Sequence, residues 1–163
     1  MAGGPADART GGRSDGRVLA VDWGRKRFGV AMSDPGRLIA QPLTTLTRRE
    51  GQRPPVAALL DLIRAHCVTE LVVGLPLSPE GEEGEAAAEV RAFGAALARR
   101  AALPLTFWDE RLSTALALRS ARAAGVKDRD SRDRIDQMAE VAILQHFLDA
   151  RLAAVRRAAE ADA

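Results

Sequence analysis

Residues 18–34, VLAVDWGRKRFGVAMSD, decide the fold of this chain. A first strand is predicted over 17–23, because a short apolar run rich in β-forming residues is typical of a buried strand. Gly24 and the basic residues after it predict a turn, and a second strand is expected at 28–32. The stretch therefore predicts a strand-turn-strand unit in which Asp22 stands where the first apolar strand ends.

The rest of the chain predicts an α/β fold with a mixed five-stranded sheet. A turn at 34–36 leads to a third strand, so the first three strands are expected to form an antiparallel meander. Helical spacing then alternates with short apolar runs, which indicates a βαβ unit whose strands are parallel. These further elements are expected as a strand at 38–46, a helix at 54–66, a strand at 71–73, a helix at 83–101, a strand at 105–108 and helices at 112–124 and 132–157.

The composition is that of one globular domain. The chain has 163 residues, of which 47% are hydrophobic and 28% are charged, which excludes a disordered protein. No stretch approaches the roughly 20 apolar residues that cross a bilayer, so no membrane partner is expected. The segment 1–16 has no apolar region of the kind found in a secretory signal. We expect a disordered leader at 1–16, a single domain at 17–157 and a C-terminal tail at 158–163.

Cys67 is the single cysteine of the chain. No intrachain disulfide can form, which is typical of a protein that works in a reducing cytosol. A cytoplasmic location is therefore expected, while an intermolecular bridge through Cys67 stays open as an alternative.

Arginine supplies most of the positive charge and is clustered. The net charge is only +2, but basic residues concentrate at 25–27, at 48–49, at 99–100 and between 119 and 134. The planar guanidinium group suits phosphate oxygens, so nucleic-acid binding is one explanation of the clusters. A GC-rich genome that writes arginine wherever a surface needs charge is the other, and charge alone does not choose between them.

Carboxylates follow the ends of the predicted strands. In open α/β sheets, ligands bind beyond the carboxyl ends of the parallel strands. If the first strand is parallel to the last two, Asp22 meets the loop at 74–76 and the segment that contains Glu110. Asp136 is a third carboxylate, early in the last helix among residues that should be buried. The pattern predicts that Asp22, Glu110 and Asp136 converge on one edge of the sheet.

Carboxylates that converge on one place repel one another, so such a cluster normally holds a cation. Oxygen ligands favour Mg²⁺ or Mn²⁺ over zinc, and the chain has no Cys/His pair at zinc spacing. A two-metal carboxylate site is a general means of phosphodiester hydrolysis. Each residue also has a structural explanation, since Asp22 suits an Asx turn and Glu110 and Asp136 suit the first turns of helices. That explanation is the stronger one for each residue singly and the weaker one for the three together.

Four blocks of the sequence occur in a recognisable order and spacing. The blocks are VDWGRKRFGVAMSD with Asp22, Gly24, Arg27 and Gly29; VVGLPLSPEGEEG with Gly74, Leu75, Pro76, Leu77 and Gly81; WDERLST with Asp109, Glu110, Arg111, Leu112, Ser113 and Thr114; and IDQMAEVAIL with Asp136, Ala139, Ile143 and Leu144. In these blocks the chain, from about 18 to 148, resembles the YqgF (RuvX) family of bacterial Holliday-junction-resolvase-like nucleases, which have an RNase H-like fold.

The resemblance implies a function and a set of catalytic residues. It implies that Asp22, Glu110 and Asp136 form an acidic triad that binds Mg²⁺ or Mn²⁺. It further implies a nuclease that matures the 5′ end of the 16S rRNA precursor, with branched DNA such as a Holliday junction as the older suggested substrate. A non-catalytic rRNA assembly factor is a different class of function, and a module that does not cut has no need of three converging acids.

Glu140 departs from the family pattern, which usually has alanine at this position. It lies one helical turn after Asp136 and shares its face. It either adds a fourth acid to the metal site or pairs with a neighbouring arginine such as Arg134 or Arg111. An extra carboxylate adds repulsion unless a partner offsets it, so the sequence favours the arginine pair.

Six further residues are candidates for binding nucleic acid. Some follow Glu110 into a helix start, where backbone N–H groups also favour a phosphate. The others are basic residues next to Asp22 or before Asp136. The candidates are Lys26, Arg111, Ser113, Thr114, Lys127 and Arg132. For the basic residues, a solvated loop is an equally good explanation.

Actin-like and sugar-kinase domains open with a similar Asp-x-Gly strand turn, which in those proteins binds nucleotide phosphates. They need two such domains around ATP, whereas 163 residues make one, and no Walker A sequence is present. That class is excluded. The expected partners are structured RNA or branched DNA and a second copy of the chain, because the small residues of the Ala-rich helix at 83–101 permit a homodimer.

Overall fold

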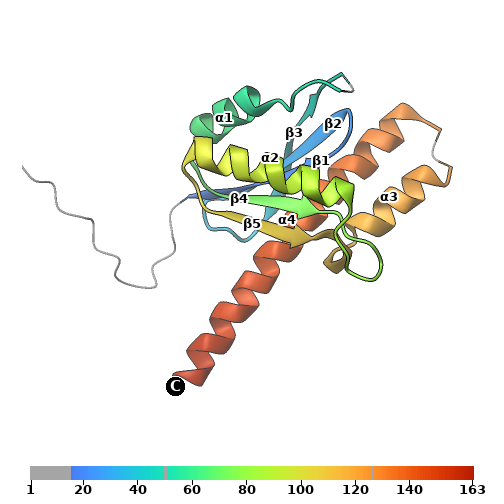
Figure 1. Ribbon diagram of the computed structural model, residues 1–163. Coiled ribbons are helices and arrows are strands. Elements are labelled where there is room, and N and C mark those ends of the chain that lie inside the picture. The colour runs from blue at the N-terminus through green and yellow to red at the C-terminus, as the bar shows by residue number, and fades with distance from the viewer. Residues whose placement is uncertain (1–15, 50, 126) are drawn as a thin grey trace, which may run out of the picture.

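The computed structural model describes residues 16–49, 51–125 and 127–163, so the expected leader at 1–16 lies, except for Gly16, outside the described residues. Helices cover both faces of one five-stranded sheet (Figure 1). The elements are β1 (Arg17–Trp23), β2 (Arg27–Ser33), β3 (Ala40–Thr47), α1 (Val56–Ala65), β4 (Val68–Leu75), α2 (Glu85–Ala101), β5 (Leu105–Asp109), the 3₁₀ turn η1 (Glu110–Leu112), α3 (Ala115–Ala123) and α4 (Arg129–Ala161).

The sheet has the strand order β3-β2-β1-β4-β5. The pairs β1–β2 and β2–β3 are antiparallel, while β4 is parallel to β1 and β5 is parallel to β4. This topology confirms the predicted meander, the βαβ unit and the mixed sheet. The three parallel strands end at one edge of the sheet, at Trp23, Leu75 and Asp109.

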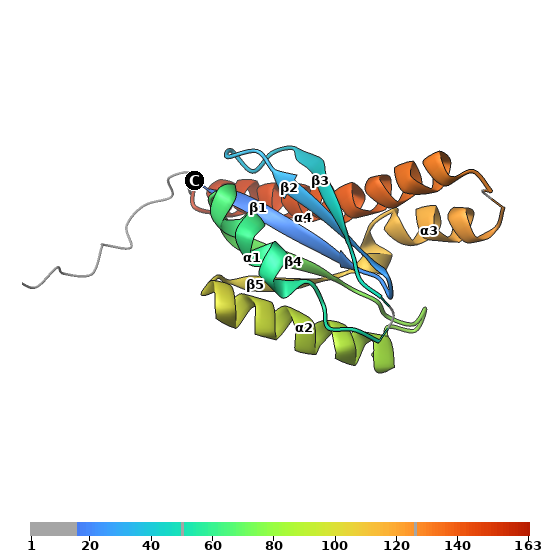
Figure 2. The same cartoon turned by 90° about the horizontal axis from the view of Figure 1, so that it is seen from above.

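Alternation along β1 directs its side chains into two cores. Leu19 and Val21 pack in one core, and Val18 and Ala20 pack in the other. Figure 2 shows α1 and α2 on one face of the sheet and α4 on the other. Because successive side chains point to opposite faces, Asp22 continues the row that faces α4. Trp23 packs in the other core. The end of β1 therefore presents an acid to one face of the sheet and an aromatic ring to the other.

The last two helices differ from their predicted bounds. The helix expected at 112–124 is the turn η1 followed by α3, because the Asp109 carboxylate accepts the backbone N–H of Arg111 and closes a separate turn. α4 begins earlier than predicted, since Asp128 caps it by accepting a backbone N–H of the first turn. It also continues through 158–161, which the sequence assigned to a tail. None of the described helices is long and apolar enough to span a membrane.

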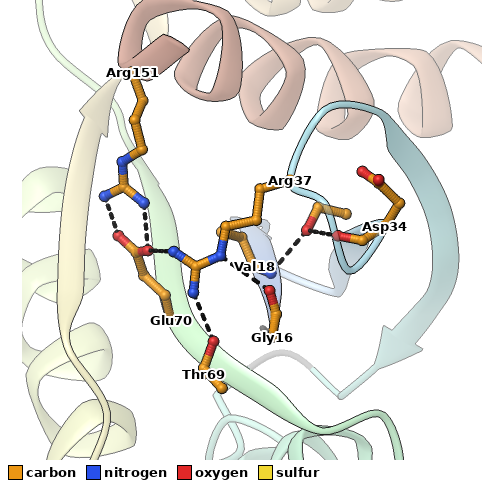
Figure 3. A network of polar contacts seen from close by, with 8 residues as sticks. Gly16, Val18, Asp34, Arg37, Thr69, Glu70 and Arg151 are labelled. Carbon is orange, nitrogen blue, oxygen red and sulfur yellow. Dashed lines mark hydrogen bonds and ion pairs between the residues drawn. The ribbon is translucent and has the colours of Figure 1, made fainter. Parts of the chain in front are cut away.

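β4 is longer than the strand predicted at 71–73. The apolar pattern stops short of Glu70, because a charged residue does not predict a buried strand position. Glu70 is only 6% exposed. Its carboxylate accepts a hydrogen bond of 3.0 Å from Arg37 and two of 2.5 Å from Arg151 (Figure 3). Arg37 in turn donates to the Thr69 hydroxyl at 2.7 Å. This arrangement of Glu70, Arg37 and Arg151, here called the Glu70 clamp, ties α4 to the beginning of β4.

Candidate active site at the carboxyl edge of the sheet

Asp22 lies opposite Gly29 in the β1–β2 pair, close to the edge where the parallel strands end. Glu140 of α4 fills the space beside this glycine, because a Cβ at Gly29 would overlap the Glu140 carboxylate. Asp136 precedes Glu140 by one helical turn and lies on the same face of α4. The strand pair and the helix thus bring Asp22, Asp136 and Glu140 to one place.

These three carboxylates line a cavity of about 580 Å³, here called the acidic cavity. The β1–β2 turn forms one wall, and Thr45, which pairs with Gly29 across the sheet, belongs to another. α3 contributes Arg122. The other lining residues are Trp23, Gly24, Arg25, Lys26, Arg27 and Gly29.

Two arginines offset the charge of Asp136. Arg27 places one guanidinium nitrogen 3.8 Å from Asp136 Oδ2 and 2.6 Å from Asp133 Oδ1. Arg122 Nε lies 3.3 Å from Asp136 Oδ1. Both arginine side chains are 37% exposed. The cavity therefore combines acids that suit a cation with partly exposed guanidinium groups that suit a phosphate.

Glu140 is the most unusual acid of the cavity. It is 2% exposed, and its Oε1 atom is buried without a hydrogen-bond partner. Burial, and after it the nearby charges of Asp22 and Asp136, raise the pKa of Glu140 to about 9. At neutral pH the side chain is therefore a neutral acid in the absence of a cation.

The arginine pair that the sequence favoured for Glu140 is not found among the described residues, where no arginine forms an ion pair with it. Arg111 instead forms an ion pair with Asp109, the last residue of β5, two positions before it in the sequence. Arg134 is exposed and stands six residues before Glu140, so it projects from a different side of α4. The structure places Glu140 with the acids, which is the alternative that the sequence ranked second.

Glu110 lies beside the acidic cavity and does not line it. It is 4% exposed, at the end of β5. A Cβ at Gly74 would stand 2.9 Å from Glu110 Oε1 and 3.1 Å from Ile143 Cδ1. Glu110 is therefore packed between β4 and α4, on the same face of the sheet as Asp22.

The donor set fits a hard divalent cation. Within the part of the chain that the structure describes, no three Asp, Glu, His or Cys side chains lie close enough together to enclose a metal ion as they stand. Yet Glu140 Oε1 is a buried oxygen that no protein group satisfies, and a cation would satisfy it. All the available donors are carboxylate oxygens, which suit Mg²⁺ or Mn²⁺.

Among the basic candidates of the sequence, Lys26 lines the acidic cavity and Arg111 does not. Arg111 donates to both carboxylate oxygens of Asp109, at 2.7 to 3.1 Å, and to the carbonyl of Pro79 at 3.0 Å. The hydrogen bonds from Arg111 hold the pKa of Asp109 below its usual range. In this structure Arg111 thus fastens the loop before α2 to the end of β5.

The four remaining candidates lie outside the lining of the acidic cavity. The Ser113 hydroxyl donates to the carbonyl of Glu110 at 3.2 Å, so it shapes the turn that follows that acid. Thr114, Lys127 and Arg132 are exposed. Their part in binding nucleic acid stays a prediction.

Thr45 and Arg122 are cavity residues that sequence reasoning did not single out. The sequence marks Arg27 only as a member of a basic cluster and of a family block. The alternation of β2 and β3 is the signal that could have found Thr45, because it pairs with Gly29. No sequence signal selects Arg122, since its position depends on how α3 packs against α4.

A family model described as "RuvX: Holliday junction resolvase" matches residues 16–150. The chain belongs to the RuvX family. The match includes the whole sheet and the part of α4 that carries Asp136 and Glu140, so it confirms the resemblance that the four sequence blocks indicated.

Curated proteins similar to this RuvX-family chain carry one name, "Putative pre-16S rRNA nuclease". A Roseiflexus protein is 45% identical over 134 residues, which are 82% of this chain and 94% of that protein. A Moorella thermoacetica protein is 45% identical over 133 residues, 82% of this chain and 94% of its own. A Frankia casuarinae protein is 44% identical over 134 residues, which are 82% of this chain and 66% of that protein.

Among solved structures, T. thermophilus RuvC in complex with a Holliday junction substrate superposes with a TM-score of 0.51. It is 22% identical and covers 83% of this chain and 96% of its own. At that identity the similarity concerns the fold, and it confirms the predicted RNase H-like α/β class.

Proposed function

We propose that this RuvX-family chain is a divalent-metal-dependent nuclease that hydrolyses phosphodiester bonds at the 5′ end of the 16S rRNA precursor, in the cytoplasm. The observation that carries the proposal is Glu140 Oε1, a buried oxygen without a partner beside Asp22 and Asp136. A cation bound among these carboxylates would satisfy that oxygen. The name that the relatives carry, "Putative pre-16S rRNA nuclease", supports the same proposal.

Asp22, Asp136 and Glu140 are the proposed ligands of Mg²⁺ or Mn²⁺, and Glu110, beside Gly74 on the same face of the sheet, is proposed as a further ligand. When bound, the metal supplies an activated water and stabilises the leaving oxygen. Glu140 gives up its proton on becoming a ligand, because carboxylates bind metal as anions.

The arginines of the acidic cavity are proposed to hold the substrate phosphate. Arg27 and Arg122 pair with Asp136 in this structure, and each is more than one third exposed. Once Asp136 serves as a ligand, their guanidinium groups can turn to phosphate oxygens in bidentate fashion. Lys26, exposed at the rim, adds a third positive charge to the path of the strand.

A four-way DNA junction is the second candidate substrate. The family description names a Holliday junction resolvase, and the similar RuvC was solved with such a substrate. The same acids and arginines suit either backbone, because they contact phosphates and not bases. A non-catalytic rRNA assembly factor is the third candidate, and the cluster of acids argues against it.

The test compares wild type with Asp22→Asn on a 16S rRNA precursor fragment and on a four-way DNA junction, with EDTA, Mg²⁺ or Mn²⁺. We expect metal-dependent cleavage by wild type and a loss of at least about 100-fold in the variant. Asp61→Asn, which removes an exposed carboxylate of α1, is the matched control and should cut normally. Equal cleavage by Asp22→Asn, or cleavage in EDTA, would contradict the proposal.

A homodimer also remains a proposal, resting on α2. Ala88 and Ala95 of this helix are exposed, while Gly94 is already used inside the chain, where it packs against Phe107. Light scattering at micromolar concentration should give twice the mass of one chain. A monomer mass would remove the dimer and leave the nuclease proposal unaffected.

A further inference from the structure

A second cavity, of about 930 Å³, lies on the other side of the β1–β2 turn. It shares Trp23, Gly24 and Arg25 with the acidic cavity. Gly24 admits no side chain, because a Cβ there would collide with the Arg27 carbonyl. A nucleic-acid strand that crosses this turn at Gly24 would therefore pass from one cavity into the other close to the backbone.

Arg48 lines the second cavity, and its planar guanidinium group is here called the Arg48 plate. Its guanidinium carbon lies 4.7 Å from the centre of the Trp23 ring and 5.0 Å from that of Phe28. Arg48 donates to the carbonyls of Arg25 and Gln52, at 2.9 Å each. These bonds use two of the five N–H groups and fix the plane of the guanidinium. A planar cation backed by an aromatic ring is a surface on which a nucleobase stacks.

Apart from Arg25 and Gln52, the remaining walls of the second cavity are apolar or acidic. Trp23, Phe93, Pro54 and Pro76 supply apolar surface. Glu85 and Glu89, one turn apart on α2, are exposed and form no ion pair with any residue that the structure describes. Two carboxylates disfavour a phosphate in this cavity, because like charges repel. They favour a flat ligand that carries hydrogen-bond donors on its edge.

We propose that the second cavity binds one unpaired nucleobase of the strand whose phosphate lies in the acidic cavity, and that guanine is the base it prefers. The location beside the cleaved bond rests on the proposed nuclease function, whereas the binding of the base does not. The base stacks on the Arg48 plate and turns its Watson–Crick edge toward Glu85 and Glu89.

The preference for guanine follows from the chemistry of an ionised carboxylate, which only accepts hydrogen bonds. Guanine presents two adjacent donors on its Watson–Crick edge, N1–H and the 2-amino group. Uracil presents one donor between two carbonyl oxygens, which the acids would repel. Adenine and cytosine present an amino group next to an acceptor nitrogen, so we expect them to bind more weakly than guanine and more tightly than uracil.

Tryptophan fluorescence tests the binding of the base without any cleavage. Trp108→Phe leaves Trp23 as the single tryptophan, and guanosine 5′-monophosphate is then titrated in EDTA alongside the other three mononucleotides. We expect guanosine monophosphate to quench Trp23 and to bind about tenfold tighter than uridine monophosphate. Calorimetry on the unaltered chain repeats the comparison if Trp108→Phe fails to fold.

The paired variant Glu85→Gln with Glu89→Gln should abolish the preference for guanine, because a carboxamide also donates. Both positions are exposed, so folding should be unaffected. Glu82→Gln, an exposed acid outside the cavity, is the matched control. Equal binding of all four mononucleotides by wild type, or an unchanged preference in the paired variant, would overturn the proposal. So would quenching by an arginine-rich peptide alone, since the acids would then serve a protein partner.

Cleavage assays separate the failure of this pocket from the failure of the nuclease. Replacing guanine by inosine in the unpaired parts of the rRNA fragment should raise KM about tenfold and leave kcat unchanged. Guanine-selective quenching without metal-dependent cleavage of any substrate would keep the pocket and remove the nuclease. Metal-dependent cleavage with equal KM for both substrates would remove the pocket from the reaction and keep the nuclease.

Discussion

Two buried glutamates of this chain, Glu70 and Glu140, are treated in opposite ways by the fold. Glu70 lies at the beginning of β4 and faces α4, whereas Glu140 belongs to α4 itself and lies beside the carboxyl edge of the sheet. Glu70 is enclosed by Arg37 and Arg151, and its hydrogen bonds raise the pKa of Arg151. Glu140 is at least as deeply buried, yet it has an oxygen without a partner and a pKa raised to about 9.

The difference distinguishes Glu70, which stabilises the fold, from Glu140, which is proposed to bind a cation. A buried acid must be neutralised by a partner or by a proton. The protein supplies the partner at Glu70, and it supplies two further acids at Glu140. Without metal a proton neutralises Glu140, and a cation could take the place of that proton, which supports the proposal that this end of the sheet is the functional one.

The largest expected effect concerns pH, in EDTA. Glu140 has an ordinary pKa of 4.5 in the unfolded chain and one of about 9 in the folded chain. The folded state therefore binds a proton that the unfolded state releases, and the stability of wild type is full below 4.5 and falls as the pH rises toward 9. Relative to Glu140→Gln, wild type should lose up to about 4 kcal/mol of unfolding free energy between pH 5 and pH 8. Urea unfolding at several pH values measures this loss, and parallel profiles for the two proteins would refute it.

Removing the enclosed acid should also be severe. Glu70→Gln leaves Arg37 and Arg151 without their counter-charge, so we expect the unfolding free energy to drop by about 3 kcal/mol. Cleavage per folded molecule should stay normal, because the clamp touches no residue of the acidic cavity. Urea unfolding and an activity assay measure the two quantities, with Asp61→Asn as the exposed control. A stable Glu70→Gln protein would show that the clamp is dispensable.

Metal should complete the acids around Glu140 and leave the clamp unchanged. At one hundred times its dissociation constant, Mn²⁺ should raise the unfolding free energy of wild type by about 2.7 kcal/mol. Asp22→Asn should gain much less, and Glu70→Gln should gain as much as wild type. Thermal unfolding with and without Mn²⁺ measures the gains. A full gain in Asp22→Asn would place the metal elsewhere.

The smallest expected effect tests the packing that admits Glu140. Gly29→Ala brings a Cβ into the Glu140 carboxylate, so we expect a loss of about 2 kcal/mol. In a Glu140→Ala background the overlap with the carboxylate is gone and only the residue-140 Cβ, at 3.3 Å, remains close, so the same substitution should cost much less. A double-mutant cycle by urea unfolding measures the coupling between the two sites. Additive losses would mean that Gly29 is required for another reason.

Much of the fold could be predicted from the sequence, because short-range patterns determine it. Alternating and apolar runs indicated all five strands and the parallel arrangement that places Asp22 at the carboxyl edge. β4 was predicted too short because Glu70 does not resemble a buried strand residue until its two arginines are seen. These come from a turn 33 residues earlier and a helix 81 residues later.

The site was predicted in part. Asp22 and Asp136 meet in the acidic cavity as the sequence suggested, and Glu110 lies beside it. Glu140 was assigned to an arginine pair because a sequence shows which arginines exist and not which are already engaged. Arg111 is engaged by Asp109, and Arg27 and Arg122 are shared with Asp136. Such competition among partners is decided by tertiary packing alone.

α4 is one continuous helix that contributes residues both to the acidic cavity and to the Glu70 clamp. It bears Asp136 and Glu140 toward one end and Arg151 eleven residues further, about 16 Å along the helix. A single residue inserted between Glu140 and Arg151 would rotate the two ends against each other by about 100°. The clamp could then be kept only by turning both acids away from Asp22. Deletions and insertions in this interval should therefore be far less tolerable than substitutions, since the length of α4 between Glu140 and Arg151 fixes the orientation of the proposed metal ligands.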